Sequence, residues 1–221
     1  MAGVVRHRPD RNGAPASLTA SASAPEDRGL STLQLLLGTA AILALSLARA
    51  TALRWGAIDI APAAAFASLL LLGSLGLPSV RQRLRGLPEN RSLVLGAALG
   101  AALLIPGLWM LLHGVVGPDA YLSSTFAIVW GPLVALIAIG EEVALRAWMQ
   151  PLARQAWGPT AAIVFAAAVF AAIHAPIYGW VALPLDFGVG ILIGCLREYT
   201  RSVAACALAH FIVDIGHWWL P

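Results

Sequence analysis

Long apolar stretches follow one another along most of this chain, and they restrict what it can fold into. A helix needs about 20 mostly apolar residues to cross the hydrocarbon core of a bilayer, which is about 30 Å thick. Only 11% of the 221 residues are charged, whereas a soluble domain carries about 25%. An all-α, polytopic membrane helical bundle with about seven transmembrane helices is therefore predicted. The expected spans are Leu30–Leu47, Ile60–Leu77, Ser92–Leu112, Pro132–Gln155, Pro159–Ala175, Trp180–Leu196 and Val203–Leu220.

The chain divides into three parts by composition. Residues 1–29 are polar and rich in Arg, Ser, Ala and Pro, which predicts a disordered cytosolic tail. Residues 30–112 are expected to form three N-terminal transmembrane helices, and residues 121–221 a core of four more. The apolar stretch Tyr121–Trp130 either extends the fourth helix or forms an interfacial piece before it.

Arginine supplies all 14 strongly basic side chains, and its distribution predicts the orientation. Cytoplasmic loops of membrane proteins carry an excess of basic residues. With a cytoplasmic N-terminus, twelve arginines lie inside and two, Arg49 and Arg54, lie outside. We expect a multi-pass protein of the cell (inner) membrane with its C-terminus outside, the lipid bilayer as its surroundings and no nucleic acid as a partner.

Two pairs of small residues indicate close helix packing. Gly96 and Gly100, and Gly190 and Gly194, are each four residues apart. This spacing places both glycines of a pair on one helix face, where the backbones of two membrane helices approach closely. The two cysteines, Cys195 and Cys206, lie in apolar runs and offer neither a disulfide framework nor a CxxC metal site.

Ionisable side chains cluster in the last four apolar spans. Each such residue costs roughly 2.5–3.5 kcal/mol at the bilayer centre, so these residues are usually functional. Glu142 and His174 each lie fifteen residues from the turn that joins their spans, or about 22 Å deep at 1.5 Å per residue. His210 and Asp214 lie about 14 and 20 Å past Arg201 by the same rise. We therefore expect one site at a common depth.

Spacing along each helix suggests different roles for the members of this cluster. Glu142 and Arg146 are four residues apart, so they are predicted to form a buried structural ion pair. Glu141 points about 100° away from Glu142 and is the available base. His210 and Asp214 are also four residues apart, which lets the carboxyl group orient the imidazole, and His217 continues that face.

Other polar residues receive simpler interpretations. His113, Asp59 and Asp119 are expected in solvated loops, whereas Asp186 is expected to line water or cap a helix. Cys206 lies one turn before His210, so a Cys–His nucleophile is one alternative. A small buried side chain is the better interpretation, because nothing nearby in the sequence favours the thiolate.

Three motifs together resemble the CPBP intramembrane proteases, a family that includes type II CAAX prenyl endopeptidases and bacteriocin-processing or immunity proteins. The motifs are Glu141-Glu142-x-x-x-Arg146, Phe170-x-x-x-His174 and His210-x-x-x-Asp214. Each is weak alone, but their order in successive apolar spans is specific. The resemblance runs from about Leu133 to Asp214 and includes the glycine-rich stretch Phe187–Gly194. The first three spans match only as generic apolar helices.

The resemblance implies roles for these residues. Glu141 and His174 would activate a water molecule, while His210 and Asp214 would stabilise the oxyanion. Glu142, Arg146 and Phe170 would support them, and no cofactor or metal is implied. Ala147 stands where the family often has Gly, and Asp214 where it commonly has Asn. An ionised Asp214 would repel an oxyanion, so it either donates a hydrogen bond as a neutral carboxyl or orients His210.

Three functions remain open from the sequence. The first is a metal-independent glutamic endopeptidase that acts on a membrane-tethered peptide or protein. The second is a zinc protease with the metal on Glu141, His174 and His210, a set that resembles a His₂Glu catalytic site. The third is a non-proteolytic membrane immunity or scaffold protein. The resemblance does not imply prenyl specificity for this chain, and the sequence does not define its substrate.

Overall fold

The computed structural model of the protein describes residues 25–56, 58–86, 88–106, 108 and 124–217, and every regular element in this part is a helix. Its elements, in chain order, are α1 (Pro25–Arg54), α2 (Ile60–Leu75), α3 (Pro78–Arg83), α4 (Asn90–Leu103), α6 (Ser124–Glu142), the π-helix η1 (Val143–Met149), α7 (Gln150–Trp157), α8 (Pro159–Tyr178), the short 3₁₀ helix η2 (Trp180–Ala182), α9 (Leu183–Thr200) and α10 (Val203–His217). The predicted all-α class is thus confirmed for these residues.

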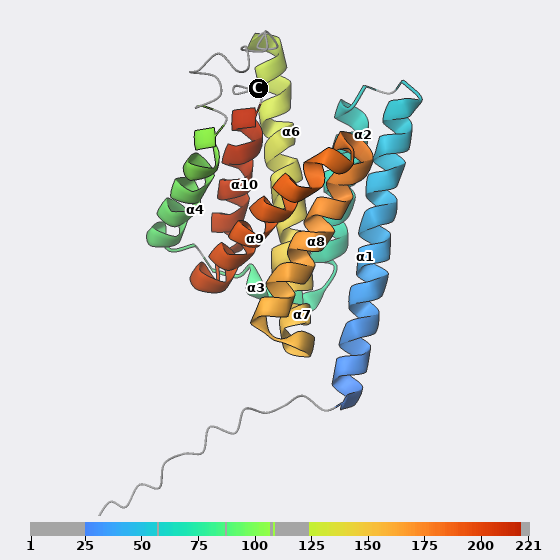
Figure 1. Ribbon diagram of the computed structural model, residues 1–221, viewed down its shortest axis with the longest axis vertical. Coiled ribbons are helices and arrows are strands. Elements are labelled where there is room, and N and C mark those ends of the chain that lie inside the picture. Colours follow the sequence, from blue (N-terminus) through green and yellow to red (C-terminus); the bar gives the residue numbers. More distant parts are fainter. Residues whose placement is uncertain (1–24, 57, 87, 107, 109–123, 218–221) are drawn as a thin grey trace, which may run out of the picture.

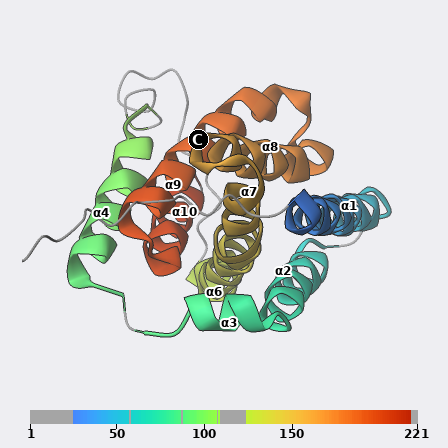
Figure 2. The same cartoon turned by 90° about the horizontal axis from the view of Figure 1, so that it is seen from below.

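The long helices form a bundle around the continuous run of α6, η1 and α7 (Figures 1 and 2). On one side of this run, α2 packs against α6, and α1 packs against α2, α7 and α8. On the other side, α10 packs against α6, α4 and α9, while α8 packs against α9 and α7. The last four long helices therefore surround one interior region.

Three helical segments are long and apolar enough to cross a membrane: Ser31–Arg54, Pro159–Tyr178 and Trp180–Thr200. Ile60–Leu75, Asn90–Leu103 and Val203–Gly216 are apolar but shorter. The protein is therefore a helical membrane protein, although the predicted number of seven spans is not confirmed. The predicted third span is shorter than expected, since α4 ends at Leu103. His113 and Asp119 lie outside the described residues.

Helix α1 is longer than the apolar stretch that predicted it. It begins at Pro25, within the segment expected to be a disordered tail, and continues past Leu47 to Arg54. The extension is stabilised at its far end, where Arg49 makes two hydrogen bonds to the carboxylate of Asp59. Asp59, predicted to be a solvated loop residue, is thus an ion-pair partner that fastens the end of α1 to the start of α2.

Seven of the 14 arginines lie at one end of the bundle, which we call the basal end. Helix α3, the start of α4, and the connections α7–α8 and α9–α10 all lie at the end where α1 begins (Figure 1). These segments carry Arg81, Arg83, Arg85, Arg91, Arg154, Arg197 and Arg201. Arg49 and Arg54 belong to the opposite end of α1. These seven arginines, which the orientation prediction places on the cytoplasmic side, thus lie together at the basal end of the fold.

Glycines sit where helix backbones approach closely, as their spacing predicted. A Cβ atom on Gly96 would lie 2.3 Å from the carbonyl oxygen of Ala205 in α10, and one on Gly190 would lie 2.9 Å from Cα of Ala167 in α8. A third such contact was not predicted: a Cβ on Gly140 would lie 2.7 Å from the carbonyl oxygen of Ala67 in α2. This contact seats α6 against α2 immediately before the two glutamates.

The fourth predicted span is not one regular helix, because it widens into the π-helix η1 directly after Glu142. Proline has no N–H group, so Pro151 cannot donate to the carbonyl of Ala147 one turn earlier. Arg83 donates to that carbonyl instead, at 3.1 Å, and Arg197 donates to the carbonyl of Arg146 at 3.1 Å. Short π-helical segments are frequent at functional sites, and this one begins beside the candidate site.

Candidate active site

Glu141 lies between two histidines that come from different helices. Its Oε2 atom is 4.0 Å from Nε2 of His174 in α8 and 3.8 Å from Nε2 of His210 in α10. The Glu141 side chain is 2% exposed. Neither Glu141 Oε2 nor His210 Nε2 has a hydrogen-bond partner among the described residues, although both atoms are buried. Three helices thus bring a carboxylate and two imidazoles to one point, as the depth argument predicted.

The orientation of His174 follows from its backbone contact. Its Nδ1 atom is 2.7 Å from the carbonyl oxygen of Phe170, one turn earlier in α8. A carbonyl only accepts hydrogen bonds, so Nδ1 carries the proton and donates it. In the neutral ring, Nε2 then has a free lone pair, which faces Glu141. The His174 side chain is 16% exposed, which makes it the more open of the two histidines.

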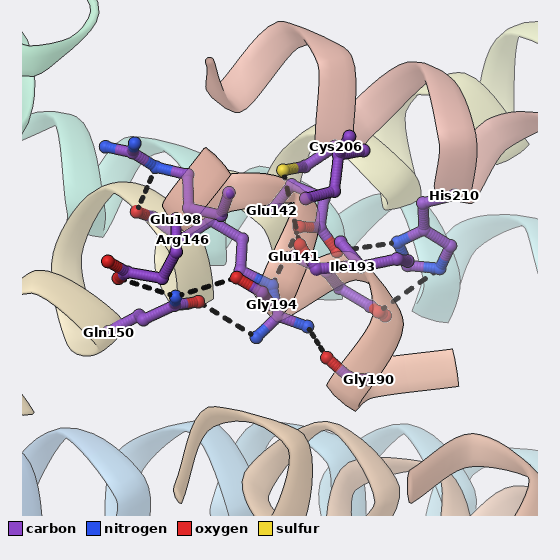
Figure 3. A network of polar contacts seen from close by, with 12 residues as sticks. Glu141, Glu142, Arg146, Gln150, Gly190, Ile193, Gly194, Glu198, Cys206 and His210 are labelled. Atoms are coloured by element: carbon purple, nitrogen blue, oxygen red, sulfur yellow. Dashed lines mark hydrogen bonds and ion pairs between the residues drawn. The ribbon is translucent and has the colours of Figure 1, made fainter. Parts of the chain in front are cut away.

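His210 is oriented by Glu142 rather than by Asp214 alone. Its Nδ1 atom lies 3.1 Å from Oε1 of Glu142, and the other carboxylate oxygen of Glu142 lies 3.1 Å from Nε of Arg146. All three side chains are almost completely buried. The predicted Glu142–Arg146 pair is present, but sequence spacing missed that the same carboxylate also accepts from His210. One carboxylate oxygen of Glu142 therefore forms the ion pair with Arg146, and the other oxygen orients the imidazole of His210 (Figure 3).

Asp214 lies at the open edge of the cluster. Its Oδ2 atom is 3.4 Å from Nε2 of His210, the same nitrogen that faces Glu141. The Asp214 side chain is 32% exposed, far more than the glutamates. This position on the Nε2 side places the carboxyl group where a substrate oxygen that contacts His210 would also lie.

Phe170 contacts both imidazoles. Its ring centroid lies 4.6 Å from that of His174 and 5.1 Å from that of His210, the latter in an edge-to-face arrangement. Tyr178 stacks on the other side of His174 at 5.7 Å. The rings therefore limit how far either histidine can turn, and Phe170 also supplies the carbonyl that orients His174.

A second layer of buried polar groups extends from Arg146 toward the basal end. Arg146 donates to the carbonyl of Gly190 at 3.1 Å and lies 3.5 Å from Oε1 of Gln150. Gln150 is completely buried and donates to the carbonyl of Gly194 and to Glu198, each at 3.1 Å. Glu198 then pairs with Arg154. The network clamps η1 and α7 onto the glycine-rich face of α9 (Figure 3).

Three further residues singled out in the sequence, Cys206, Asp186 and His217, are not part of the cluster around Glu141 as the structure describes it. Cys206 is buried, and its sulfur lies 3.3 Å from the carbonyl of Ser202 and 3.7 Å from that of Ile193. Asp186 lies in the first turn of α9, where the helix N-terminus favours an anion. His217 ends α10, and its side chain is outside the described part.

The described residues do not contain a built metal site. No group of three His, Cys, Asp or Glu side chains among them is arranged to hold a metal ion. In the predicted set, Oε2 of Glu141 lies 3.8 and 4.0 Å from the Nε2 atoms of His210 and His174.

Comparison with known proteins places this site in a family. The family model described as type II CAAX prenyl endopeptidase, Rce1-like, matches residues 123–216. No match was found among curated proteins or solved structures. The matched range holds α6 to α10 and includes every residue of the candidate site, whereas α1 to α4 lie outside it. Through these helices and the residues that they bring together, residues 123–216 are similar to the type II CAAX prenyl endopeptidases, which supports the resemblance to the CPBP family that the three motifs indicate.

Proposed function

We propose that the protein is an intramembrane endopeptidase that hydrolyses a peptide bond in a membrane-associated protein or peptide. The observation that carries this proposal is the buried carboxylate of Glu141, which faces the Nε2 atoms of His174 and His210 at 4.0 and 3.8 Å. These distances are too long for direct hydrogen bonds. A water molecule that bonds to these groups would satisfy the buried oxygen of Glu141, which has no hydrogen-bond partner among the described residues.

In the proposed mechanism, Glu141 and His174 hold the attacking water. Because Nδ1 of His174 donates to Phe170, its Nε2 accepts one hydrogen of the water while Glu141 accepts the other. Because both hydrogens of the water are held in hydrogen bonds, a lone pair of its oxygen is directed at the substrate carbonyl. Glu141 takes the proton as the water attacks, acting as a general base. It later returns the proton to the leaving amine.

His210 and Asp214 complete the proposed mechanism on the oxyanion side. With Nδ1 committed to Glu142, a protonated His210 offers its Nε2–H to the negative charge that develops on the carbonyl oxygen. Asp214 adds a second hydrogen bond when its carboxyl group is neutral. Glu142 already orients the imidazole, which favours this donor role for Asp214 over an orienting role.

The substrate is expected to be held by the membrane. The site lies inside a bundle of apolar helices, so a peptide attached to or embedded in the bilayer reaches it more readily than a soluble protein does. A cytoplasmic N-terminus is proposed from the arginines at the basal end. Nucleic acid has no part in the proposed function, and neither does a resident metal.

The experiment that tests this function compares the termini of membrane proteins from two cell lines. One line carries the wild-type protein and the other carries Glu141→Gln, each in place of the native copy. We expect a small set of new termini that are present only with the wild-type protein. Glu89→Gln makes the same chemical change at an exposed position before α4 and should keep these termini.

Two results would count against the proposal. Identical termini in the wild-type and Glu141→Gln cells would favour the non-proteolytic scaffold. Cleavage that is lost on chelation and restored by zinc, together with stoichiometric zinc in the purified protein, would favour the metal-dependent alternative.

A further inference from the structure

A cavity at the basal end lies away from the candidate active site. It has a volume of about 550 Å³ and opens between α1 on one side and α3, η1 and α7 on the other. Figure 2 looks along the bundle from the basal end and shows α7 and α1 on neighbouring sides of the bundle, with α3 at its edge beside α2. The proposed protease chemistry uses none of the residues that line this cavity.

The lining changes from polar to apolar along the axis of the bundle. Gln34 of α1 lies near the basal end, and Leu37, Gly38 and Ala41 follow on the same helix. From Gln34 to Ala41 the rise is about 10 Å. Opposite them, Leu152 and the ring of Trp148 form an apolar wall. A ligand that fits this cavity has a polar end at the membrane surface and an apolar part that points into the bilayer.

Arg83 gives the polar end of the cavity a positive charge. Its side chain lines the cavity, and its recorded partner is the carbonyl of Ala147 at 3.1 Å, which uses one of five N–H groups. No carboxylate lies within 4.0 Å of it in the part of the chain that the structure describes. Burial lowers the pKa of Arg83 from its usual value, which is the expected result when a cation is partly desolvated without an anion.

The surroundings of Arg83 add to this charge. Arg81 and Arg85 lie two residues to either side of it and are exposed. None of the described residues that line the cavity is acidic. Basic pockets between transmembrane helices, close to the membrane surface, are suited to anionic lipid headgroups.

We propose that this cavity is a binding site for an anionic phospholipid, whose phosphate contacts Arg83 and whose acyl chain lies along Leu37, Ala41, Trp148 and Leu152. The lipid would bridge α1 to the α3–η1 region. Its headgroup would be satisfied by the N–H groups of Arg83 that the Ala147 carbonyl does not use, together with Gln34 and Ser79 at the same end. This site is independent of the peptidase activity.

The test measures lipid retention by native mass spectrometry of the full-length protein after delipidation in detergent. Phosphatidylglycerol and phosphatidylcholine with the same acyl chains are added back separately. The wild type should retain more phosphatidylglycerol. Arg83→Gln should weaken that binding about fivefold, the size expected for one basic contact at an anionic surface. Arg85→Gln removes the same charge from an exposed neighbour outside the cavity and should change binding little.

A second pair of variants tests the apolar part and leaves Arg83 intact. Ala41→Trp should fill the cavity and reduce retention, whereas Ala40→Trp places the same ring on an exposed neighbouring position outside it. This pair decides the question if Arg83→Gln does not fold. Equal retention of the two lipids by the wild type would overturn the proposal. So would equal losses within either matched pair.

Discussion

Nδ1 of His210 lies 3.1 Å from Oε1 of Glu142, so two residues 68 positions apart share a buried hydrogen bond. The other oxygen of the same carboxylate binds Arg146 at 3.1 Å. Glu142 therefore joins a structural ion pair to an imidazole of the candidate site. Glu141, one residue earlier, faces both histidines and forms no ion pair with an arginine in the described part of the chain. The two adjacent glutamates thus stand in different electrostatic environments.

This difference predicts opposite results for two conservative substitutions. Glu142→Gln should lower both stability and activity, because it leaves Arg146 as an uncompensated buried charge, an effect of roughly 3–5 kcal/mol in buried pairs. Glu141→Gln should leave a folded but inactive protein. Thermal unfolding in detergent and peptide cleavage measure both effects. Equal losses of thermal stability in the two variants would contradict the assignment of Glu141 as the base and of Glu142 as the structural partner of Arg146.

Gln150 is predicted to position Arg146. Gln150→Leu keeps a similar volume but removes the contacts to Arg146, Gly194 and Glu198. Leaving such groups unsatisfied costs about 1–3 kcal/mol each. We expect lower stability, and a lower kcat with little change in KM, because Arg146 acts on His210 only through Glu142. Gln82→Leu, at an exposed position of α3, is the control. A Gln150→Leu protein with wild-type kcat would contradict this role.

Asp214 tests the oxyanion side of the mechanism. If it donates a hydrogen bond, it must be protonated during catalysis and lose this function as the pH rises. Asn donates the same bond at any pH, so Asp214→Asn should keep its activity and extend it toward alkaline pH. A pH–rate profile of both proteins in nanodiscs gives the answer. A large loss for the Asn variant at every pH would show that the carboxylate instead supports His210 as an anion.

The orientation in the membrane is predicted from the arginines at the basal end. With that end in the cytoplasm, a reporter fused after Pro221 should be exported, and one fused before Met1 should remain inside. The two fusions serve as controls for each other. A cytoplasmic signal from the C-terminal reporter would mean that the number of membrane crossings differs by one from the predicted topology.

Spacing along single helices predicted much of this site, because it depends only on helix geometry. The Glu142–Arg146 pair and the common depth of the glutamates and His174 belong to this class. The glycine spacing predicted that Gly96 and Gly190 lie at close helix contacts, but it did not predict which helices they meet. Contacts between helices depend on how each helix is rotated about its axis, and one sequence does not fix that rotation. This is why the Glu142–His210 bond was missed.

The sequence analysis predicted neither the π-helix η1 nor the ion pair between Arg49 and Asp59, and the reason differs between the two. Hydrophobic patterning detects apolar stretches of sequence. The π-helix η1 changes the hydrogen-bonding pattern between α6 and α7, but the stretch remains largely apolar there, so the pattern gives no sign of it. Pro151, which removes a backbone donor, was the available signal. For Arg49, the apolar run ends before the helix does, so the sequence placed Arg49 and Asp59 in loops. Their mutual contact holds both at helix ends.

The most direct test of the central claim is cleavage of a membrane-tethered peptide by the purified protein in nanodiscs, in the presence of a chelator. The substrate comes from the termini found in cells. Wild type and Glu89→Gln should cleave it at similar rates, and Glu141→Gln should reduce the rate by at least about 10², the lower range of contributions from a general base. Cleavage by Glu141→Gln at the wild-type rate would contradict the assignment of Glu141 as the base.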